Sequence, residues 1–351
     1  MTIEITNRRV CCVSDIHVGV HQNSSMWHDI TLKWAGWLRD SLKSTGVSDI
    51  IIPGDLFHYR DEIAVNTIHV VADLLDIWKD FNIVLLVGNH DAFYKDKSDI
   101  NSLSILNGRR NVHVISTPKQ IRYLGRKLMF CPWGTSLDQI KPSDIVFGHF
   151  EIMTFKYNQH KICESGMKSD GLISKSPLII TGHFHLREER KYDSGTVLYV
   201  GNPFQMDFGD AGSTKGYYIL DLKTSEYEFF ENTISPKHHK IKLSELANYG
   251  NITPEVENLF HNNILKLVID KTISPDDMDI LIRRLTELNS ISLTVDYDVN
   301  FNKFGLDEEN ESDLSSVDIP TAIEEFINML EDVPNKQEII DYTVELYNSS
   351  K

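Results

Sequence analysis

A pattern that occurs five times limits what this chain can fold into: an apolar run ends, and a side chain of the metal-binding type follows it. The runs are residues 9–14, 49–53, 82–87, 144–147 and 178–181. Such runs are typical of buried strands, and layered α/β proteins bind ligands where their parallel strands end. We therefore predict that the five strand ends meet at one site.

The polar residues that follow the runs are Asp15, His17, Asp55, Asn89, His149, His183 and His185. A single Asp-x-His pair would say little, because two polar residues two apart are common. Seven such residues at strand ends are stronger evidence for a shared site, since buried polar groups are costly unless they have partners. The alternative is that these residues are either buried polar groups with ordinary hydrogen-bond partners or surface residues. We favour a metal centre.

Composition narrows the class of protein. The chain has 351 residues, of which 41% are hydrophobic, enough for a large core and one or two smaller units. The first residues contain no apolar signal region, and no apolar run approaches the roughly 18 to 20 residues that cross a bilayer. We expect a soluble, cytoplasmic protein with no membrane partner.

Charge and cysteine content exclude further classes. The net charge is -16, which argues against a protein that binds nucleic acid over its whole surface but not against a local phosphate site. Four cysteines in a chain of this length do not make a disulfide framework. Cys11 and Cys12 lie in a predicted strand, so we expect them to be small buried side chains.

Two amphipathic helices are predicted between the first strands, over residues 26–44 and 62–78, from the helical spacing of their apolar side chains. Tryptophans in the first helix are more typical of a core than of a base-stacking platform. Strand-helix-strand alternation favours parallel pairing at the centre of this sheet. Segment 154–175 is interpreted as a surface loop, with contact to a phosphate backbone through its lysines as the alternative.

Short strands follow from residue 112 onward, and their spacing predicts a second, more antiparallel sheet packed on the first. These strands are residues 112–115, 120–123, 127–131, 144–147, 178–181, 197–200, 217–222 and 227–230. Residues 233–240 break the pattern and mark a predicted domain boundary. Beyond it, strands at 264–269 and 291–295 flank a helix at 275–288. His238 and His239 lack partners at metal-ligand spacing.

Four parts are therefore predicted: a main domain over 1–234, an accessory α/β domain over 235–300, an acidic linker over 301–318 and a helical tail over 319–351. The linker region carries six acidic residues and one lysine, which is typical of a solvated segment. The tail has two apolar helical stripes separated by Pro334. It either folds back on the body or docks on a partner, and we favour the partner.

The motif order Asp-x-His, Gly-Asp, Gly-Asn-His-Asp, Gly-His and Gly-His-x-His resembles the calcineurin-like metallophosphoesterase superfamily. The version Gly54-Asp55-Leu56-Phe57-His58 resembles the SbcD-type nuclease subunits of bacteria and phages, which work with an SMC-like ATPase on DNA double-strand breaks. The resemblance covers roughly residues 10–210. It implies an α/β fold, a two-sheet β-sandwich flanked by helices, with a small α/β capping domain and a helical C-terminal tail.

The resemblance also implies two divalent metal ions that share Asp55. Asp15, His17, Asp55 and His185 would hold one ion, and Asp55, Asn89, His149 and His183 the other. Hard and borderline ligands without a thiolate favour Mn²⁺, with Zn²⁺ and Fe²⁺ left open. Such a pair activates water for in-line attack on a phosphodiester.

The implied catalytic residues are His90 and His58. His90 would stabilise the transferring phosphoryl group or protonate the leaving oxygen, and His58 would orient His90. A surface loop histidine is the alternative for His58. Asp91 is expected to hydrogen-bond a metal ligand or the loop.

The implied function is a Mn²⁺-dependent DNA exonuclease and endonuclease in break repair and recombination, working in a bacterial cell or a phage-infected host. The tail would bind the SMC-like ATPase, and the chain would form a homodimer. The alternatives are a metallophosphatase or small-nucleotide phosphodiesterase, and a non-catalytic scaffold. Phosphoprotein phosphatases place an arginine just after the second motif, whereas Tyr59 here separates His58 from Arg60.

Overall fold

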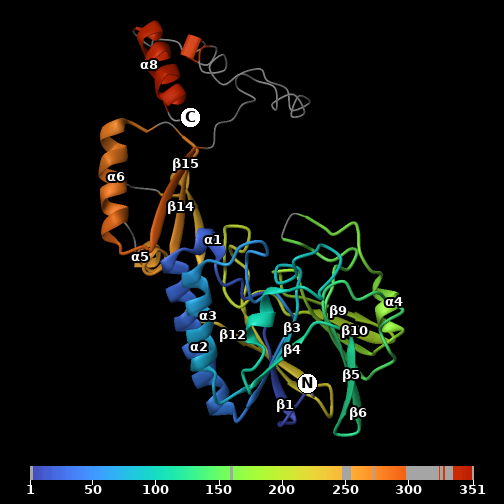
Figure 1. The fold of residues 1–351 in the computed structure, drawn as a ribbon. Coiled ribbons are helices and arrows are strands. Elements are labelled where there is room, and N and C mark those ends of the chain that lie inside the picture. The colour runs from blue at the N-terminus through green and yellow to red at the C-terminus, as the bar shows by residue number, and fades with distance from the viewer. Residues whose placement is uncertain are drawn as a thin grey trace. The chain divides into compact units, whose positions relative to one another are not determined.

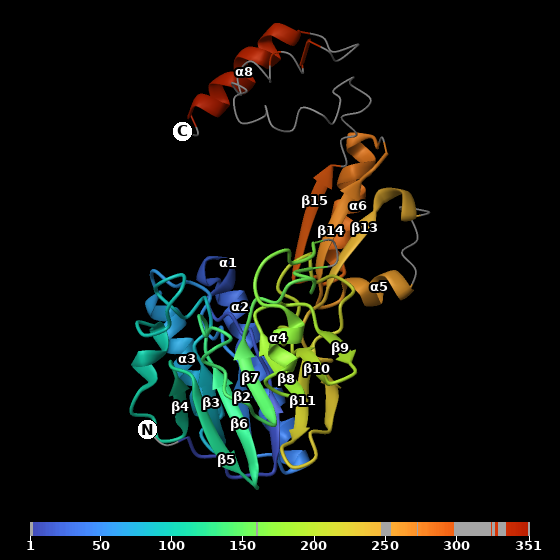
Figure 2. The same cartoon turned by 90° about the vertical axis from the view of Figure 1, so that its right-hand side faces the viewer.

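Two six-stranded sheets packed against each other form the main body of the protein, and a three-stranded sheet follows them in the chain. The structure is a computed structural model that describes residues 3–158, 161–246, 254–271, 273–297, 324, 327–328 and 335–349. The chain divides into two compact units, Met1–Asp296 and Tyr297–Lys351. Figures 1 and 2 show the sheets and their helices.

The first sheet has a parallel centre and an antiparallel edge. In order across the sheet, its strands are β12 (Tyr227–Glu231), β11 (Gly216–Asp221), β1 (Arg9–Cys12), β2 (Asp49–Ile52), β3 (Asn82–Leu86) and β4 (Val112–Ile115). Strands β1 to β4 pair in parallel, whereas β11 pairs antiparallel with both β1 and β12. The predicted parallel pairing is confirmed.

The second sheet has a similar layout. Its order is β5 (Lys119–Tyr123), β6 (Arg126–Cys131), β7 (Ile145–His149), β8 (Leu178–Gly182), β10 (Gly195–Tyr199) and β9 (Glu188–Tyr192). Strands β6, β7, β8 and β10 pair in parallel, and only the edge strands β5 and β9 are antiparallel. The prediction of a more antiparallel second sheet is therefore wrong.

The predicted membership of the second sheet is also partly wrong, because β4, β11 and β12 belong to the first sheet. An apolar run identifies a strand, but the partner of that strand is set by contacts between distant parts of the chain. Strand β9 was not predicted, since its residues Glu188–Tyr192 are mostly charged and lie at the sheet edge.

Helices α2 (Ser25–Thr45) and α3 (Val65–Ile77) pack on the outer face of the first sheet (Figure 1). Their buried side chains include Trp34 and Leu74, and the indole of Trp78 donates a 2.9 Å hydrogen bond to the Ala35 carbonyl. The predicted helix at 26–44 is confirmed. The second helix begins three residues later than predicted, at Val65, because Ala64 is extended. A short turn, α1 (Val20–Asn23), precedes α2.

Successive side chains of a strand point to opposite faces of its sheet, so the core is divided into layers. Val10 and Cys12 of β1 face the space between the sheets, whereas Cys11 faces the helices. All four cysteines are buried and free, which confirms the predicted burial of Cys11 and Cys12. Segment 154–175 is more than a surface loop: Phe155 and Leu172 pack on the outer face of the second sheet, and it contains α4 (Ser169–Ile173). Residues 159–160 lie outside the described part.

The third sheet has three strands, which lie in the order β13 (His238–Lys242), β14 (Ile264–Ile269) and β15 (Ser292–Tyr297). Its helices are α5 (Pro254–Phe260) and α6 (Pro275–Glu287), and a cluster that includes Leu267 and Leu281 fills the space beneath α6. The predicted strands and helix beyond residue 264 are confirmed. Strand β13, however, begins inside the segment predicted as a break. The predicted domain boundaries at 234 and 300 stay predictions.

The second unit contains α8 (Lys336–Ser349), which confirms the second predicted tail helix. The acidic linker at 301–318 and most of the first apolar stripe at 319–330 lie outside the described residues.

Two short 3-10 helices in the first unit, η1 (Ser102–Leu106) and η2 (Leu243–Glu245), come after β3 and β13 in the chain. Within the described ranges, no helix has both the length and the apolar character needed to span a bilayer.

Candidate metal centre

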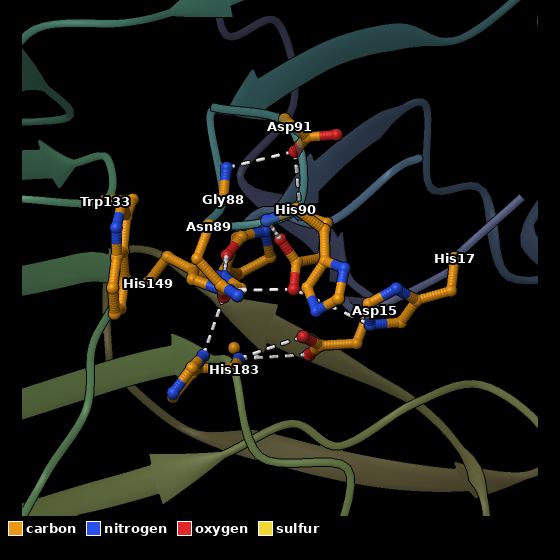
Figure 3. Close-up of polar contacts among 12 residues, drawn as sticks. Asp15, His17, Gly88, Asn89, His90, Asp91, Trp133, His149 and His183 are labelled. Atoms are coloured by element: carbon orange, nitrogen blue, oxygen red, sulfur yellow. Dashed lines mark hydrogen bonds and ion pairs between the residues drawn. The ribbon is translucent and has the colours of Figure 1, made fainter. Parts of the chain in front are cut away.

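The loops that follow β1, β2, β3, β7 and β8 converge at one edge of the two sheets (Figure 3). All seven residues predicted as metal ligands lie there, and each makes a polar contact with another of them. Four of the seven, Asp15, His17, Asp55 and His149, are almost completely buried. The five strand ends therefore form one polar cluster.

A first group within the cluster consists of Asp15, His17 and His185. One ligand atom from each lies within 4.8 Å of the other two. The Nε2 atoms of His17 and His185 face each other at 3.0 Å. The Asp15 carboxylate accepts the backbone N–H of His183 at 3.0 Å, which ties the loop after β1 to the loop after β8.

A second group consists of Asp55, His149 and His183, again with ligand atoms within 4.8 Å of one another. Asn89 joins it, because its Oδ1 lies 2.8 Å from both His149 Nε2 and His183 Nδ1. The Nδ1 of His149 is 2.6 Å from the Pro53 carbonyl oxygen. A backbone carbonyl is one of the common partners for the second ring nitrogen of a histidine that binds a metal.

Asp55 lies between the two groups. Its Oδ2 is 3.6 Å from His17 Nε2 on one side and 3.3 Å from His149 Nε2 on the other. Its Oδ1 accepts the backbone N–H of His90 at 2.8 Å. A single buried carboxylate that faces both groups is the arrangement that a bridging ligand requires.

Metal binding needs neutral imidazoles and ionised carboxylates, and the local electrostatics favour this state at His17 and His183 but oppose it at His149 and Asp15. Burial lowers the pKa of His17 well below its ordinary value and lowers the pKa of His183 to about 3. Burial also lowers the pKa of His149, but the Asp55 carboxylate outweighs it and raises that pKa to about 9. The donor set, four imidazoles, two carboxylates and an amide oxygen, fits a pair of divalent cations.

Four of the proposed ligands have strained backbone conformations, which the surrounding structure must hold in place. Asp15, His17 and Asp55 have φ values of 54°, 50° and 55°, and His183 has 96°, a region that costs a non-glycine residue about 1–3 kcal/mol. Two glycines allow the close approach. A Cβ on Gly54 would collide with the His149 ring, and one on Gly88 would collide with the Asp55 carboxylate.

Asp91 connects the loops after β2 and β3. Its buried carboxylate accepts four backbone N–H groups, from Asp55 at 2.9 Å, Leu56 at 3.3 Å, Phe57 at 3.0 Å and Gly88 at 3.0 Å. The Asp91 carboxylate therefore bonds both to the backbone of a proposed ligand, Asp55, and to the loop around it. Figure 3 shows this side chain above the cluster.

His90 and His58 lie beside the first group. The Nδ1 of His90 is 2.6 Å from the backbone carbonyl oxygen of His58, and the two rings stack with 5.4 Å between their centroids. The His58 ring itself contacts His17, with 3.3 Å between the Nδ1 atoms. The main chain of His58, rather than its ring nitrogens, thus makes the hydrogen bond to His90. Burial and neighbouring His90 lower the pKa of His58 to about 4.

Two residues near the site were missed from the sequence. The Trp133 ring packs against the second group, with its centroid 5.1 Å from that of His183 and 5.9 Å from that of His149. It follows β6 and could have been found as another strand end. Buried Lys215 donates to the His185 carbonyl at 2.8 Å and pairs with Asp210. Nothing in its sequence context indicates this role.

Comparison with known proteins gives several matches. Exonuclease subunit 1 of Enterobacteria phage T4 is 24% identical over 365 residues, covering 97% of this chain and 98% of that protein. Among solved structures, an archaeal phosphodiesterase has a TM-score of 0.36 at 14% identity and covers 64% of this chain and 99% of its own. A dimetal phosphatase from Danio rerio has a TM-score of 0.40 at 9% identity, and the match covers 64% of this chain and 95% of that chain.

The family comparison covers the site itself. Residues 8–211 match the calcineurin-like phosphoesterases, a stretch that contains all five strand ends and more than half of the chain. The order of motifs along this stretch and their convergence in space agree with that match. The chain belongs to the calcineurin-like phosphoesterase family.

Proposed function

We propose that this phosphoesterase is a Mn²⁺-dependent nuclease that hydrolyses phosphodiester bonds in DNA. The observation that carries the proposal is the position of the Asp55 carboxylate, 3.6 Å from His17 and 3.3 Å from His149. In this position, the single Asp55 carboxylate can bridge the two groups of donors. The exonuclease name of the phage T4 relative supports a nuclease over a phosphatase.

In this proposal, Asp15, His17, Asp55 and His185 hold one cation, and Asp55, Asn89, His149 and His183 hold the other. When bound, two divalent cations supply an activated water and neutralise charge on the phosphoryl oxygens. The carboxylate and amide oxygens suit Mn²⁺, whereas the four imidazoles also suit Zn²⁺ and Fe²⁺. Asp91 acts at a distance from the substrate by holding the loop that carries Asp55.

His90 is the proposed acid. The His58 carbonyl accepts a hydrogen bond from Nδ1 of His90, which places the proton on that nitrogen and leaves Nε2 for the substrate. Protonated His90 donates from Nε2 to the leaving oxygen or to the phosphoryl group. Its backbone N–H is committed to Asp55, so the ring position is tied to the bridging carboxylate.

An open pocket beside His90 supports the proposal of a nucleic-acid substrate. It has a volume of about 810 Å³ and is lined by His58 and His90 and by neighbours that include Tyr59, Arg60 and Gln22. Tyr59 is in turn fixed by its hydroxyl, which accepts the backbone N–H of Gln22 at 3.1 Å. The pocket shares His90, the proposed acid, with the candidate metal centre.

The proposed partner is an SMC-like ATPase, which would bind the tail at 319–351. The phage T4 relative is named as a subunit, which supports a partner chain. Within the described part of the tail, α8 exposes 66% of Tyr342 and 39% of Ile339. We also propose a homodimer formed by α2 or α3, since Val65 of α3 is 83% exposed.

Hydrolysis of bis(p-nitrophenyl) phosphate with Mn²⁺ separates an enzyme from a non-catalytic scaffold, because a scaffold gives no turnover. Duplex DNA, a phosphoprotein and a cyclic nucleotide, compared at equal concentration, then separate the classes of phosphoesterase. The proposal expects Mn²⁺-dependent cleavage of DNA. Turnover of the phosphoprotein or the cyclic nucleotide without cleavage of DNA would contradict it.

A further inference from the structure

The segment directly after the Gly-Asn-His-Asp motif exposes two aromatic side chains. Phe93 is 50% exposed and Tyr94 is 45% exposed, and their rings form an edge-to-face pair with centroids 5.0 Å apart. Lys95 and Lys97 follow and are exposed, but so are Asp96 and Asp99, so residues 95–99 carry no net charge. The uncommon feature of this surface is therefore the exposed aromatic pair itself.

This exposure does not come from a loosely held segment. The N–H of Ala92 donates to the Gly88 carbonyl at 3.1 Å, and the N–H of Phe93 donates to the Ile100 carbonyl at 3.0 Å. At the far end, the N–H of Ser102 donates to the Asp91 carbonyl at 2.9 Å. The segment is a closed loop whose two ends are bound to the motif that carries Asn89 and His90.

Trp133 connects the same loop to the metal centre. Its indole N–H donates to the Lys95 carbonyl at 2.7 Å, while its ring packs against His183 and His149. The loop and the proposed ligands therefore share one rigid support. Phe93 lies three residues from His90, within about 10 Å along the chain.

We propose that Phe93 and Tyr94 form a stacking platform for a nucleobase of an unpaired strand whose phosphodiester lies at the metal centre. This inference rests on the proposed nuclease function. The face of an aromatic ring stacks on any base, so the platform would favour single-stranded ends without selecting a sequence.

The test compares two double variants of the full chain. Phe93→Leu with Tyr94→Leu keeps apolar side chains but removes both rings, whereas Phe93→Tyr with Tyr94→Phe keeps both rings. Binding to a single-stranded oligonucleotide and to a blunt duplex is measured with Ca²⁺ in place of Mn²⁺. Folding is checked by thermal melting, and the metal centre by kcat for bis(p-nitrophenyl) phosphate.

The ring-free variant is expected to bind the single strand about tenfold more weakly, as expected for the loss of stacking on one base. In a cleavage assay with Mn²⁺, the native chain should cut duplexes with unpaired ends faster than blunt ones, and the ring-free variant should cut both at similar rates. The ring-swapped variant should match the native chain in both assays. All three proteins should have the same melting temperature and the same kcat on the small substrate.

Equal single-strand affinity in the native and ring-free proteins would overturn the platform and leave the nuclease function intact. A ring-free variant that binds DNA normally but no longer binds its ATPase would also overturn it, by showing a protein-binding surface. A native chain that hydrolyses the small substrate but cuts no DNA would overturn the nuclease function, and the platform with it.

Discussion

The buried carboxylate of Asp91 accepts the backbone N–H of Asp55 at 2.9 Å, and in this way one acidic residue positions another. Asp55 has a φ of 55°, and its conformation is held by this bond and by the adjacent bonds from Leu56 and Phe57 to the same carboxylate. The proposed bridging ligand thus depends on a residue that does not itself face a cation. This relationship leads to the first prediction.

Replacing Asp91 with asparagine should weaken both metal sites. An amide offers one acceptor oxygen to four N–H groups, and each buried donor left without a partner costs about 1–3 kcal/mol. Asp91→Asn is expected to melt at a lower temperature and to bind Mn²⁺ more weakly in calorimetric titration. Asp96→Asn, at an exposed position in the next loop, is the control. Native Mn²⁺ affinity in Asp91→Asn would contradict this account of Asp91.

Asn89 and His90 are adjacent in the sequence, but replacing them should have different effects: loss of metal affinity for Asn89 and loss of turnover for His90. Asn89 Oδ1 contacts two proposed ligands, so Asn89→Ala should weaken one of the two Mn²⁺ ions by at least about tenfold. His90→Ala keeps the backbone bond to Asp55, so both ions should remain while kcat falls about 10²- to 10⁴-fold.

Calorimetry and turnover of bis(p-nitrophenyl) phosphate, measured on the same preparations, separate the two effects. His69→Ala, at an exposed position of α3, is the matched histidine control. Two tight Mn²⁺ ions together with full activity in His90→Ala would remove His90 from the mechanism.

Lys215 should act on the metal centre through the His185 carbonyl. Lys215→Met alone leaves Asp210 buried without its cation, which costs about 3–5 kcal/mol. Adding Asp210→Asn removes the unpaired charge and should recover most of that stability. The double variant should still bind one Mn²⁺ ion about tenfold more weakly, because the His185 loop has lost its donor.

Two measurements on the Lys215 variants keep the stability effect apart from the positioning effect. Chemical denaturation gives the free energy of unfolding, and calorimetry gives the affinity of each ion. Lys223→Met, at an exposed position, is the control. A double variant with native affinity for both ions would show that Lys215 only stabilises the fold.

The tail is predicted to carry the ATPase contact. A chain that ends at Phe304 lacks α8 and the apolar stripe before it, so it should no longer co-purify with its ATPase. The candidate metal centre lies in the other unit, so turnover of bis(p-nitrophenyl) phosphate should persist. Continued co-purification of the truncated chain would place the contact elsewhere.

The strand ends were predictable because each of them is a local feature. A run such as residues 82–87 is apolar throughout since β3 is buried on both faces, and the residues after it are polar since the chain there leaves the core. The same reasoning predicted α2, and the structure confirms both. The structure also brings the seven proposed ligands together, while their roles as ligands remain a proposal.

Non-local features were not predictable. The neighbours of β4, β11 and β12 depend on which sheet each strand joins, and an apolar run carries no information about that. The positive φ of Asp15 and the four N–H groups that meet at Asp91 follow from loops packed by the whole fold. Lys215 reaches His185 only because β11 pairs with β1.

The central claim is that Asp55 bridges two cations, and anomalous diffraction at the manganese absorption edge tests it most directly. Crystals would be soaked with Mn²⁺ in the presence of a short DNA duplex. The account predicts two peaks about 3.5–4 Å apart, both coordinated by Asp55, with His185 on one and His149 on the other. A single peak, or a pair that does not contact Asp55, would contradict it.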